Sequence, residues 1–218
     1  MGIGYETVLA LYKAGAKVML TCRDPKRAKE ALIELQNTNG KGQLESALLD
    51  LSDLDSVKFF SNNFIQNHDQ LDILINNAGI SMPPASKTKE GYELQFGVNF
   101  IGHFAHTGHL YPLLKSTPNS RIVTVSSNGY QITTIDFDNL KSVIDYVPLR
   151  EYRQSKLADL IFSIELQRRI TAKGDKVLSI AVQPGANKIK LTRYLNKEAI
   201  QEGIERLGEV TDPVTLNS

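Results

Sequence analysis

The stretch "LDILINNAG", residues 71–79, is an apolar run that ends in two asparagines, an alanine and a glycine. A short apolar run that stops at turn-forming residues is typical of a strand buried on both faces. Four other stretches share this pattern: "KVMLTC" (17–22), "LESALLDL" (44–51), "RIVTVSS" (121–127) and "KVLSIAVQPG" (176–185). The sequence therefore predicts five buried strands.

Helical patterns separate these strands, at about residues 24–35, 52–67, 88–115 and 151–172. The first begins with Asp24, whose carboxylate suits an N-cap, and Pro25, which suits the first helical turn. Strands that alternate with helices imply right-handed crossovers and a mostly parallel sheet covered on both faces. We therefore expect an α/β fold in a single domain, residues 1–218.

Composition restricts the classes of function. The formal net charge is +1, so no overall field attracts nucleic acid or an anionic membrane. Cys22 is the only cysteine, which fits a reducing, cytoplasmic location. No apolar run reaches the roughly 18 residues of a membrane span, and the first residues lack a signal-peptide pattern. These features predict a cytoplasmic protein that binds neither nucleic acid nor a membrane through a span.

Polar residues or glycines follow every predicted strand. Because the carboxyl ends of parallel strands meet at one edge of a sheet, where ligands gather, these residues predict a cofactor crevice. They are Cys22-Arg23, Asp50, Asn76–Gly79, Ser126-Ser127 and Pro184-Gly185.

Tyr152 and Lys156 lie four positions apart in the last predicted helix, so they share a helix face. A free phenol has a pKa of about 10, and a nearby ammonium group lowers that value toward neutrality. Such a pair can act as a general acid or base. The same spacing also fits a solvated pair on a helix surface, so the spacing alone leaves both readings open.

The order of several motifs resembles that of the short-chain dehydrogenase/reductase family. The motifs run from "GIG" (2–4) through "INNAG" (75–79), "VNFIGHF" (98–104), "RIVTVSS" (121–127) and "YRQSK" (152–156) to "QPG" (183–185). The "CRD" that ends one strand and the long segment before "YRQSK" resemble the retinol-dehydrogenase-like branch. The resemblance implies an NADP(H)-dependent oxidoreductase that interconverts a carbonyl and an alcohol by hydride transfer.

By position, the resemblance implies a catalytic set of four residues. Tyr152 would exchange a proton with the substrate oxygen, and Lys156 would lower the pKa of the tyrosine and hold the nicotinamide ribose. Ser127 would hydrogen-bond the substrate oxygen, with Ser126 as its competitor. Asn99 would help to order a water-mediated proton relay. The alternatives are an N-cap role for either serine and a polar contact at a helix bend for Asn99.

The resemblance also implies a set of cofactor contacts. The helix that opens after the first glycines would face phosphate. The "NNAG" turn and Asp50, with Leu51 beside it, would contact the adenosine half. The "QPG" turn would lie on the nicotinamide side. An ordinary turn for "NNAG" and a helix cap for Asp50 are the alternatives. The residues are Gly2, Ile3, Gly4, Asp50, Leu51, Asn77, Ala78, Gly79, Pro184 and Gly185, together with Tyr152 and Lys156.

Arg23 bears on the choice between the two nicotinamide cofactors. An acidic residue at the end of the second strand of the fold would bind the ribose 2′-hydroxyl and select NAD, but Cys22 and Arg23 stand there. A guanidinium group can pair with a 2′-phosphate. We therefore predict NADP(H), with NAD(H) less favoured, and keep a solvated surface arginine as the alternative.

The stretch "HFAHTGH" places His103, His106 and His109 on one helix. Imidazole suits zinc, but steps of three residues drift around a helix, and no carboxylate or cysteine cluster accompanies them. We predict packing or subunit contact for these histidines and no metal site.

The ends of the sequence depart from the family pattern. The strand that normally precedes "GIG" and the usual last strand are absent, so we expect a Rossmann-like doubly wound parallel sheet, with helices on both faces, that lacks both strands. The first strand would lie between the strands that end at Cys22 and Asn76, so its absence leaves two open edges or forces them to pair anew. We expect residues 186–218 to form a short substrate-side segment and tail, with a helix at about 197–207; Ile189 stands where a threonine is common in the family.

Two further readings stay open. The chain could be a catalytically inactive binding or interaction protein, or a piece of a longer enzyme. The expected partners are a small carbonyl or alcohol substrate and a second copy of the chain, because family members commonly pair as dimers or tetramers through the helices that contain Asn99 and Tyr152.

Overall fold

The computed structural model describes residues 2–141 and 145–185; the predicted helix at 197–207, Ile189 and the substrate-side segment lie outside these ranges. In chain order the elements are α1 (Ile3–Lys13), β1 (Lys17–Cys22), α2 (Pro25–Gln36), β2 (Gln43–Leu48), α3 (Leu54–Asn67), β3 (Ile73–Asn76), α4 (Leu94–Phe96), the π-helical turn η1 (Gly97–Ile101), α5 (Gly102–Ser116), β4 (Arg121–Val125), the 3₁₀ helices η2 (Asn128–Ile132) and η3 (Phe137–Asn139), α6 (Pro148–Lys173) and β5 (Leu178–Val182).

All five predicted strands are confirmed, and every strand pair is parallel. The strands form two sheets, β1-β2 and β3-β4-β5, whereas the alternating pattern predicted one. Within the described residues β1 and β3 do not pair, so the alternative in which two edges stay open is the one observed. A cavity of about 870 Å³ lies between these edges and is lined by residues of α1, β1, β3 and α5.

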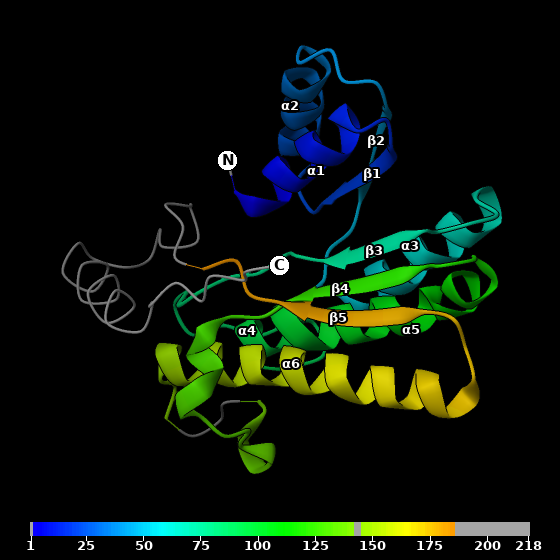
Figure 1. Cartoon of the computed structure of the whole chain (residues 1–218). Coiled ribbons are helices and arrows are strands. Elements are labelled where there is room, and N and C mark those ends of the chain that lie inside the picture. The colour runs from blue at the N-terminus through cyan, green and yellow to red at the C-terminus, as the bar shows by residue number, and fades with distance from the viewer. Residues whose placement is uncertain (1, 142–144, 186–218) are drawn as a thin grey trace, which may run out of the picture.

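The helices lie on the two sides of these sheets. Figure 1 shows α1 and α2 with β1 and β2 in the upper part of the view, and α5 and α6 beneath β3, β4 and β5. Helix α3 packs against α5. The main apolar cluster lies between these lower helices and their sheet, and includes Val57, Leu114 and Ile122, which are fully buried.

Local chemistry sets where two of the helices begin. Asp24 caps α2 as predicted, since its Oδ1 accepts from the backbone N–H groups of Lys26 at 3.0 Å and Arg27 at 3.3 Å. The helix predicted from about residue 88 begins later. Residues 88–93 form a turn with Gly91 at φ +85°, and the Glu93 carboxylate then caps α4 through the Gln95 and Phe96 N–H groups. None of the described helices is long and apolar enough to cross a membrane.

Candidate active site

Helix α6 carries both Tyr152 and Lys156. It starts with Pro148 in its first turn and ends at Gly174, which adopts the left-handed conformation with φ 69°. Lys156 is 5% exposed, whereas Tyr152 is half-buried. The Lys156 ammonium donates to the Val125 carbonyl at 2.8 Å and to Asp159 Oδ2 at 2.9 Å. The lysine is therefore anchored inside the fold, so the reading of these two residues as a solvated surface pair is wrong.

The two serines after β4 have different environments. Ser126 is buried, and its hydroxyl donates to the Lys156 carbonyl at 2.7 Å. Ser127 is half-buried, and its Oγ accepts from the Gly129 N–H at 3.3 Å as the N-cap of η2. A Cβ atom built on Gly129 would lie 3.7 Å from Ser127 Oγ and 4.0 Å from a ring carbon of Tyr152. The structure thus brings Ser127 and Tyr152 to one place, while Ser126 is occupied by the helix backbone.

Asn99 lies in η1 and is fully buried. Its Oδ1 accepts from the Ile80 N–H at 2.9 Å, and its Nδ2 donates to the Ile80 carbonyl at 3.0 Å and to Ser155 Oγ at 3.0 Å. The amide therefore clamps the backbone that follows "NNAG". A Cβ atom on Gly79 would lie 3.5 Å from Asn99 Oδ1 and 3.8 Å from Lys156 Nζ, so the loop, the amide and the ammonium meet.

The beginning of α1 fits the phosphate-binding role that was predicted for Gly2, Ile3 and Gly4. Gly2 is the N-cap of α1 and offers no side-chain hydrogen bond to the first turn. A Cβ atom on Gly4 would lie 2.6 Å from Asn77 Nδ2, so a larger residue at this position would require the Asn77 side chain to move. Backbone N–H groups at a helix N-terminus favour phosphate oxygens, and the glycine contact leaves them uncovered by a side chain.

The other predicted cofactor residues also follow strands. Asp50 Oδ1 accepts from the N–H of Ser52 at 2.9 Å and from its hydroxyl at 2.6 Å, whereas Asp53 caps α3; the helix-cap alternative for Asp50 is therefore wrong. The remaining residues divide by exposure. Leu51 is buried and Asn77 is half-buried, while Arg23, Ala78, Gly79, Pro184 and Gly185 are exposed.

Two side chains at this site were not predicted from the sequence. Asp159, 1% exposed, pairs with the Lys156 ammonium, and Ser155 joins Asn99 to α6. An acid three positions after a lysine on a helix is the signal that could have revealed Asp159. Burial raises the pKa of Asp159 to about 6, although Lys156 acts in the opposite direction.

The histidine row packs inside the fold at two of its three positions. His103 and His106 are buried, and His109 is exposed. His103 Nδ1 lies 2.7 Å from the Asn99 carbonyl, and His106 Nδ1 lies 3.1 Å from Ser61 Oγ. Among the described residues, no group of three or more histidine, cysteine, aspartate or glutamate side chains is placed to hold a metal ion.

Burial lowers the pKa of His106 to about 4, so this histidine should make the protein sensitive to acid. The unfolded chain takes up a proton at this residue below about pH 6.5, whereas the folded protein does so only near pH 4, so stability falls as the pH falls between these values. Between pH 7 and pH 5, the free energy of unfolding should decrease by about 2 kcal/mol more in the wild type than in His106→Gln. Urea unfolding at both pH values measures this difference. The exposed His109→Gln is the matched control, and equal pH dependence in wild type and His106→Gln would contradict the prediction.

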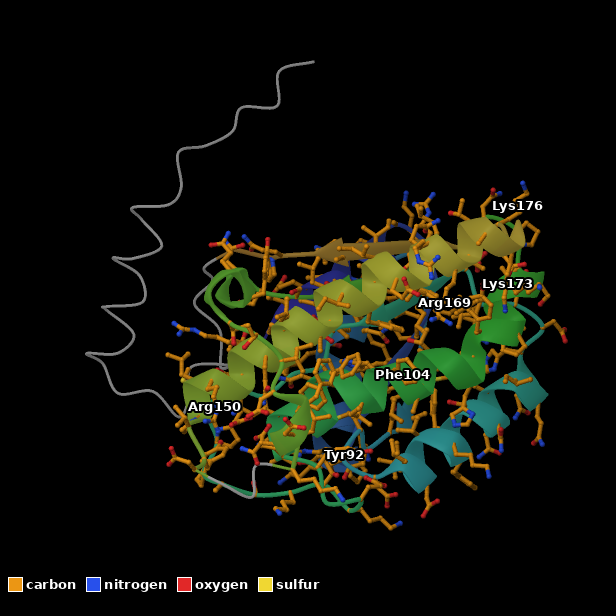
Figure 2. The ribbon with its side chains drawn as sticks, turned by 90° about the horizontal axis from the view of Figure 1, so that it is seen from below. Tyr92, Phe104, Arg150, Arg169, Lys173 and Lys176 are labelled. Carbon is orange, nitrogen blue, oxygen red and sulfur yellow. The ribbon has the colours of Figure 1, made fainter. Side chains whose placement is uncertain are left out.

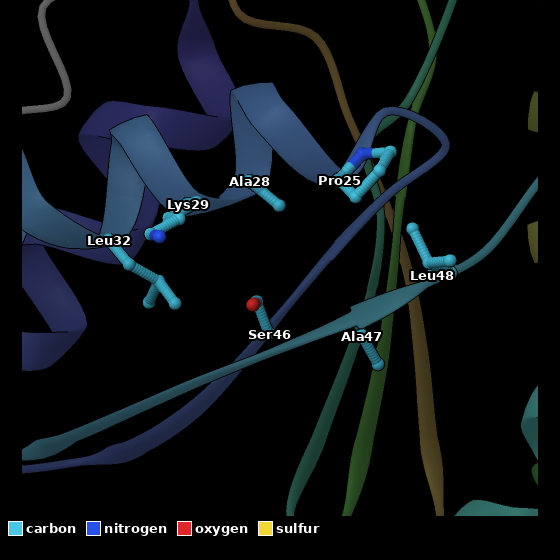
Figure 3. Close-up of a pocket in the computed structure, with 7 residues that line it drawn as sticks. All are labelled: Pro25, Ala28, Lys29, Leu32, Ser46, Ala47 and Leu48. Carbon is cyan, nitrogen blue, oxygen red and sulfur yellow. The ribbon is translucent and has the colours of Figure 1, made fainter.

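A smaller pocket of about 370 Å³ lies between α2 and β2. Figure 3 shows its walls, which are mostly apolar and include Leu32, Ala47 and Leu48. It contains none of the predicted site residues. The larger cavity between β1 and β3 is lined in part by Gly4, Asn77 and Ala78, so that cavity borders the predicted cofactor site.

Comparison with known proteins finds dehydrogenases both among family models and among similar sequences. A family model described as short chain dehydrogenase matches residues 1–200. The chain is 42% identical over 193 residues to retinol dehydrogenase 11 of Mus musculus. The aligned region covers 88% of this chain and 60% of that protein. It is 40% identical over 208 residues to retinol dehydrogenase 14 of Homo sapiens, covering 89% of this chain and 61% of that protein. The chain thus spans about three fifths of the length of these relatives.

Solved structures share the fold. An uncharacterised protein from Mycobacterium paratuberculosis is similar with a TM-score of 0.77 and 38% identity, over 88% of this chain and 68% of that one. The RhlG/NADP active-site complex of Pseudomonas aeruginosa is similar in fold, with a TM-score of 0.72 and 23% identity over 93% of this chain and 76% of that one.

Proposed function

Because the chain belongs to the short chain dehydrogenase family, we propose that it is an NADP(H)-dependent oxidoreductase that interconverts a carbonyl and an alcohol. One observation carries this proposal. Ser127 Oγ and the Tyr152 ring both lie within 4.0 Å of a Cβ atom built on Gly129, and Asn99 Oδ1 and the Lys156 ammonium both lie within 3.8 Å of one built on Gly79. Gly129 and Gly79 follow the carboxyl ends of β4 and β3. The hydroxyl of Ser127, the phenol of Tyr152 and the ammonium of Lys156 can donate hydrogen bonds or a proton, and a carbonyl oxygen needs such donors as it gains negative charge during reduction.

Each side chain has a role in this proposal. Tyr152 gives a proton to the substrate oxygen or takes one from it, and Ser127 donates a hydrogen bond to the same oxygen. Lys156 holds the nicotinamide ribose and places a positive charge on the Tyr152 side of α6. Asn99 holds the loop at Ile80 and so fixes Gly79 beside the ammonium. Bound NADP(H) would supply the hydride chemistry.

The cofactor would lie along the edge where the predicted contacts follow the strands. The open start of α1 (Gly2, Ile3 and Gly4) would bind its pyrophosphate, and Asp50, Leu51 and the Asn77–Gly79 turn would contact its adenosine half. Pro184 and Gly185 would lie on its nicotinamide side. The RhlG complex, which has the same fold, contains NADP.

The substrate we propose is an apolar alcohol or aldehyde, such as a retinoid. The support is the similarity to two proteins named retinol dehydrogenase. Titration with NADPH, followed by reduction of a panel of retinoid, steroid and aliphatic carbonyl compounds, tests the proposal. Cofactor binding without turnover of any compound would contradict the catalytic part.

The alternative function, an inactive binding protein, is favoured by the open edges of β1 and β3 beside the cofactor residues. Failure of the protein to bind NADPH would support this alternative and overturn the oxidoreductase proposal.

The preference for NADP(H) can be tested at Arg23. Arg23 is exposed directly after β1, where a guanidinium group can reach a 2′-phosphate. Arg23→Ala should lower the ratio of kcat/KM for NADPH to that for NADH by about tenfold, since a charge-assisted hydrogen bond contributes about 1.5–3 kcal/mol. Arg27→Ala, which removes another exposed arginine four positions further along the chain, is the control. A wild type that prefers NADH would refute the NADP(H) assignment.

Subunit association is also a proposal, and it concerns the face formed by α5 and α6. Figure 2 views this face, with Phe104 labelled on α5. Phe104 is 54% exposed, and its ring contacts Phe100 and Phe162, beside the exposed Ile161 and Ile164. An apolar patch on two adjacent helices fits pairing with a second copy of the chain. A monomer mass by sedimentation at micromolar concentration would contradict it.

A further inference from the structure

The Lys156 ammonium is held by two acceptors. An ammonium group has three N–H donors. In the described part of the chain, two of them are used: one bonds the Val125 carbonyl at the end of β4, and one bonds Asp159 Oδ2 one turn further along α6. Gly79 also lies near the ammonium, because a Cβ atom built there would be 3.8 Å from Nζ.

We propose that Asp159 is a positioning residue, whose carboxylate holds the Lys156 ammonium so that its third N–H faces the nicotinamide ribose beside Gly79. This inference rests on the proposed function, in which Lys156 holds that ribose. Asp159 itself does not touch the cofactor in this arrangement. It acts through the lysine.

Stability alone does not account for an acid at this position. Asp159 is 1% exposed and its partner 5%, and removing two charges from water costs more than an average ion pair returns. Within the described residues, Asp159 Oδ1 is buried without a hydrogen-bond partner, which adds a further cost. Apolar side chains in place of both members of the pair would often be neutral or stabilising, so the acid is needed here only because the ammonium is. The carboxylate is explained if its task is to fix the direction of the ammonium.

The charge state of the carboxylate fits this task near neutral pH. Burial raises the pKa of Asp159 to about 6, so at pH 8 the group is ionised and holds the ammonium. Lys156 is the ion-pair partner of Asp159 on α6. His103 of α5 faces the same ammonium; burial, and to a lesser extent Lys156, lowers the pKa of His103 to about 3, so this histidine is neutral at pH 8. Binding measured at pH 8 therefore reports on the ionised pair.

The experiment compares two ligands in three variants. Calorimetry at pH 8 would measure the affinity for NADPH and for adenosine 2′,5′-bisphosphate, which has the adenosine half but no nicotinamide ribose. Asp159→Leu removes the acceptor and should weaken NADPH binding about tenfold. Its affinity for adenosine 2′,5′-bisphosphate should stay within about twofold of the wild-type value. Asp159→Asn keeps an acceptor oxygen and should restore NADPH affinity to within about threefold of the wild type. The control is Glu165→Gln, which removes another acid of α6, one that pairs with Arg168. Its affinity for both ligands should equal that of the wild type.

Each outcome decides the question. If Asp159→Leu bound NADPH with wild-type affinity, or lost affinity for both ligands equally, Asp159 would have only a structural role. If Asp159→Leu does not fold, Asp159→Ala replaces it, and failure of both to fold would also overturn the proposal. If the wild type bound neither ligand, both the proposed function and this inference would be refuted. A wild type that binds NADPH but reduces no substrate would contradict only the catalytic proposal, since the role of Asp159 is read from binding.

Discussion

Tyr152→Phe is expected to lower kcat for carbonyl reduction by about 10²–10⁴-fold, while NADPH still binds. The substitution removes one hydroxyl group from a half-buried residue of α6, and that hydroxyl is the proposed proton donor. The aromatic ring remains, so packing around Ser127 and Gly129 should be unchanged. Steady-state kinetics with the best carbonyl substrate, together with NADPH titration, measure both effects.

Tyr92→Phe is the matched control for this variant. It removes the same atom from the turn before α4, away from the proposed site; Figure 2 labels this residue. Its kcat should equal that of the wild type. Reductase activity retained in Tyr152→Phe would reject the assignment of the phenol as the proton donor, and loss of both activity and folding would show that the hydroxyl is structural.

Asn99→Leu should lower the free energy of unfolding by about 2–6 kcal/mol, because it leaves two buried backbone groups of Ile80 unpaired at about 1–3 kcal/mol each. Leucine has the same branched shape and the same number of side-chain heavy atoms, so the substitution leaves no cavity and the loss reflects the missing hydrogen bonds. NADPH affinity should fall as well, since the Ile80 clamp fixes the neighbouring Gly79. Urea unfolding and NADPH titration measure the two effects.

Asn67→Leu, at an exposed position near the end of α3, is the control and should change stability by no more than about 0.5 kcal/mol. If Asn99→Leu kept wild-type stability and NADPH affinity but lost turnover, the relay role would be favoured over the clamp. Unchanged stability, affinity and turnover together would refute both roles.

The strands and the edge that carries the site could be predicted because their signals are local. An apolar run such as "RIVTV" indicates a buried strand by itself, and the polar residues after it fall at the same end of every strand. The cap at Asp24 depends only on its own sequence neighbours. Ser127 and Tyr152 could be placed together only through the resemblance, since they lie 25 positions apart in the sequence.

The parts that could not be predicted depend on contacts between distant segments. The sequence left open whether β1 and β3 would pair, because pairing between strands far apart in the chain has no local signal; in the described residues they belong to separate sheets. The delayed start of α4 follows from the turn at Gly91 and the cap by Glu93, which compete with an otherwise helical pattern. The clamp on Ile80 joins residues 19 positions apart in sequence, and no periodic pattern reports it.

The division into two sheets bears on how cooperatively the chain unfolds. The main apolar cluster draws on α3, β3, α5, β4 and α6. From the described segment α1 to β2, only the partly buried Met19 and Ala47 pack against this cluster, whereas Tyr12 of α1 and Leu35 of α2 are buried outside it. With no ladder from β1 to β3 in the described residues, the segment from α1 to β2 can open while the rest stays folded. Its amides should then exchange with deuterium at a lower opening free energy than those of β4, and global unfolding should occur in two steps. A substitution at Asn99 would shift the second step and leave the first in place.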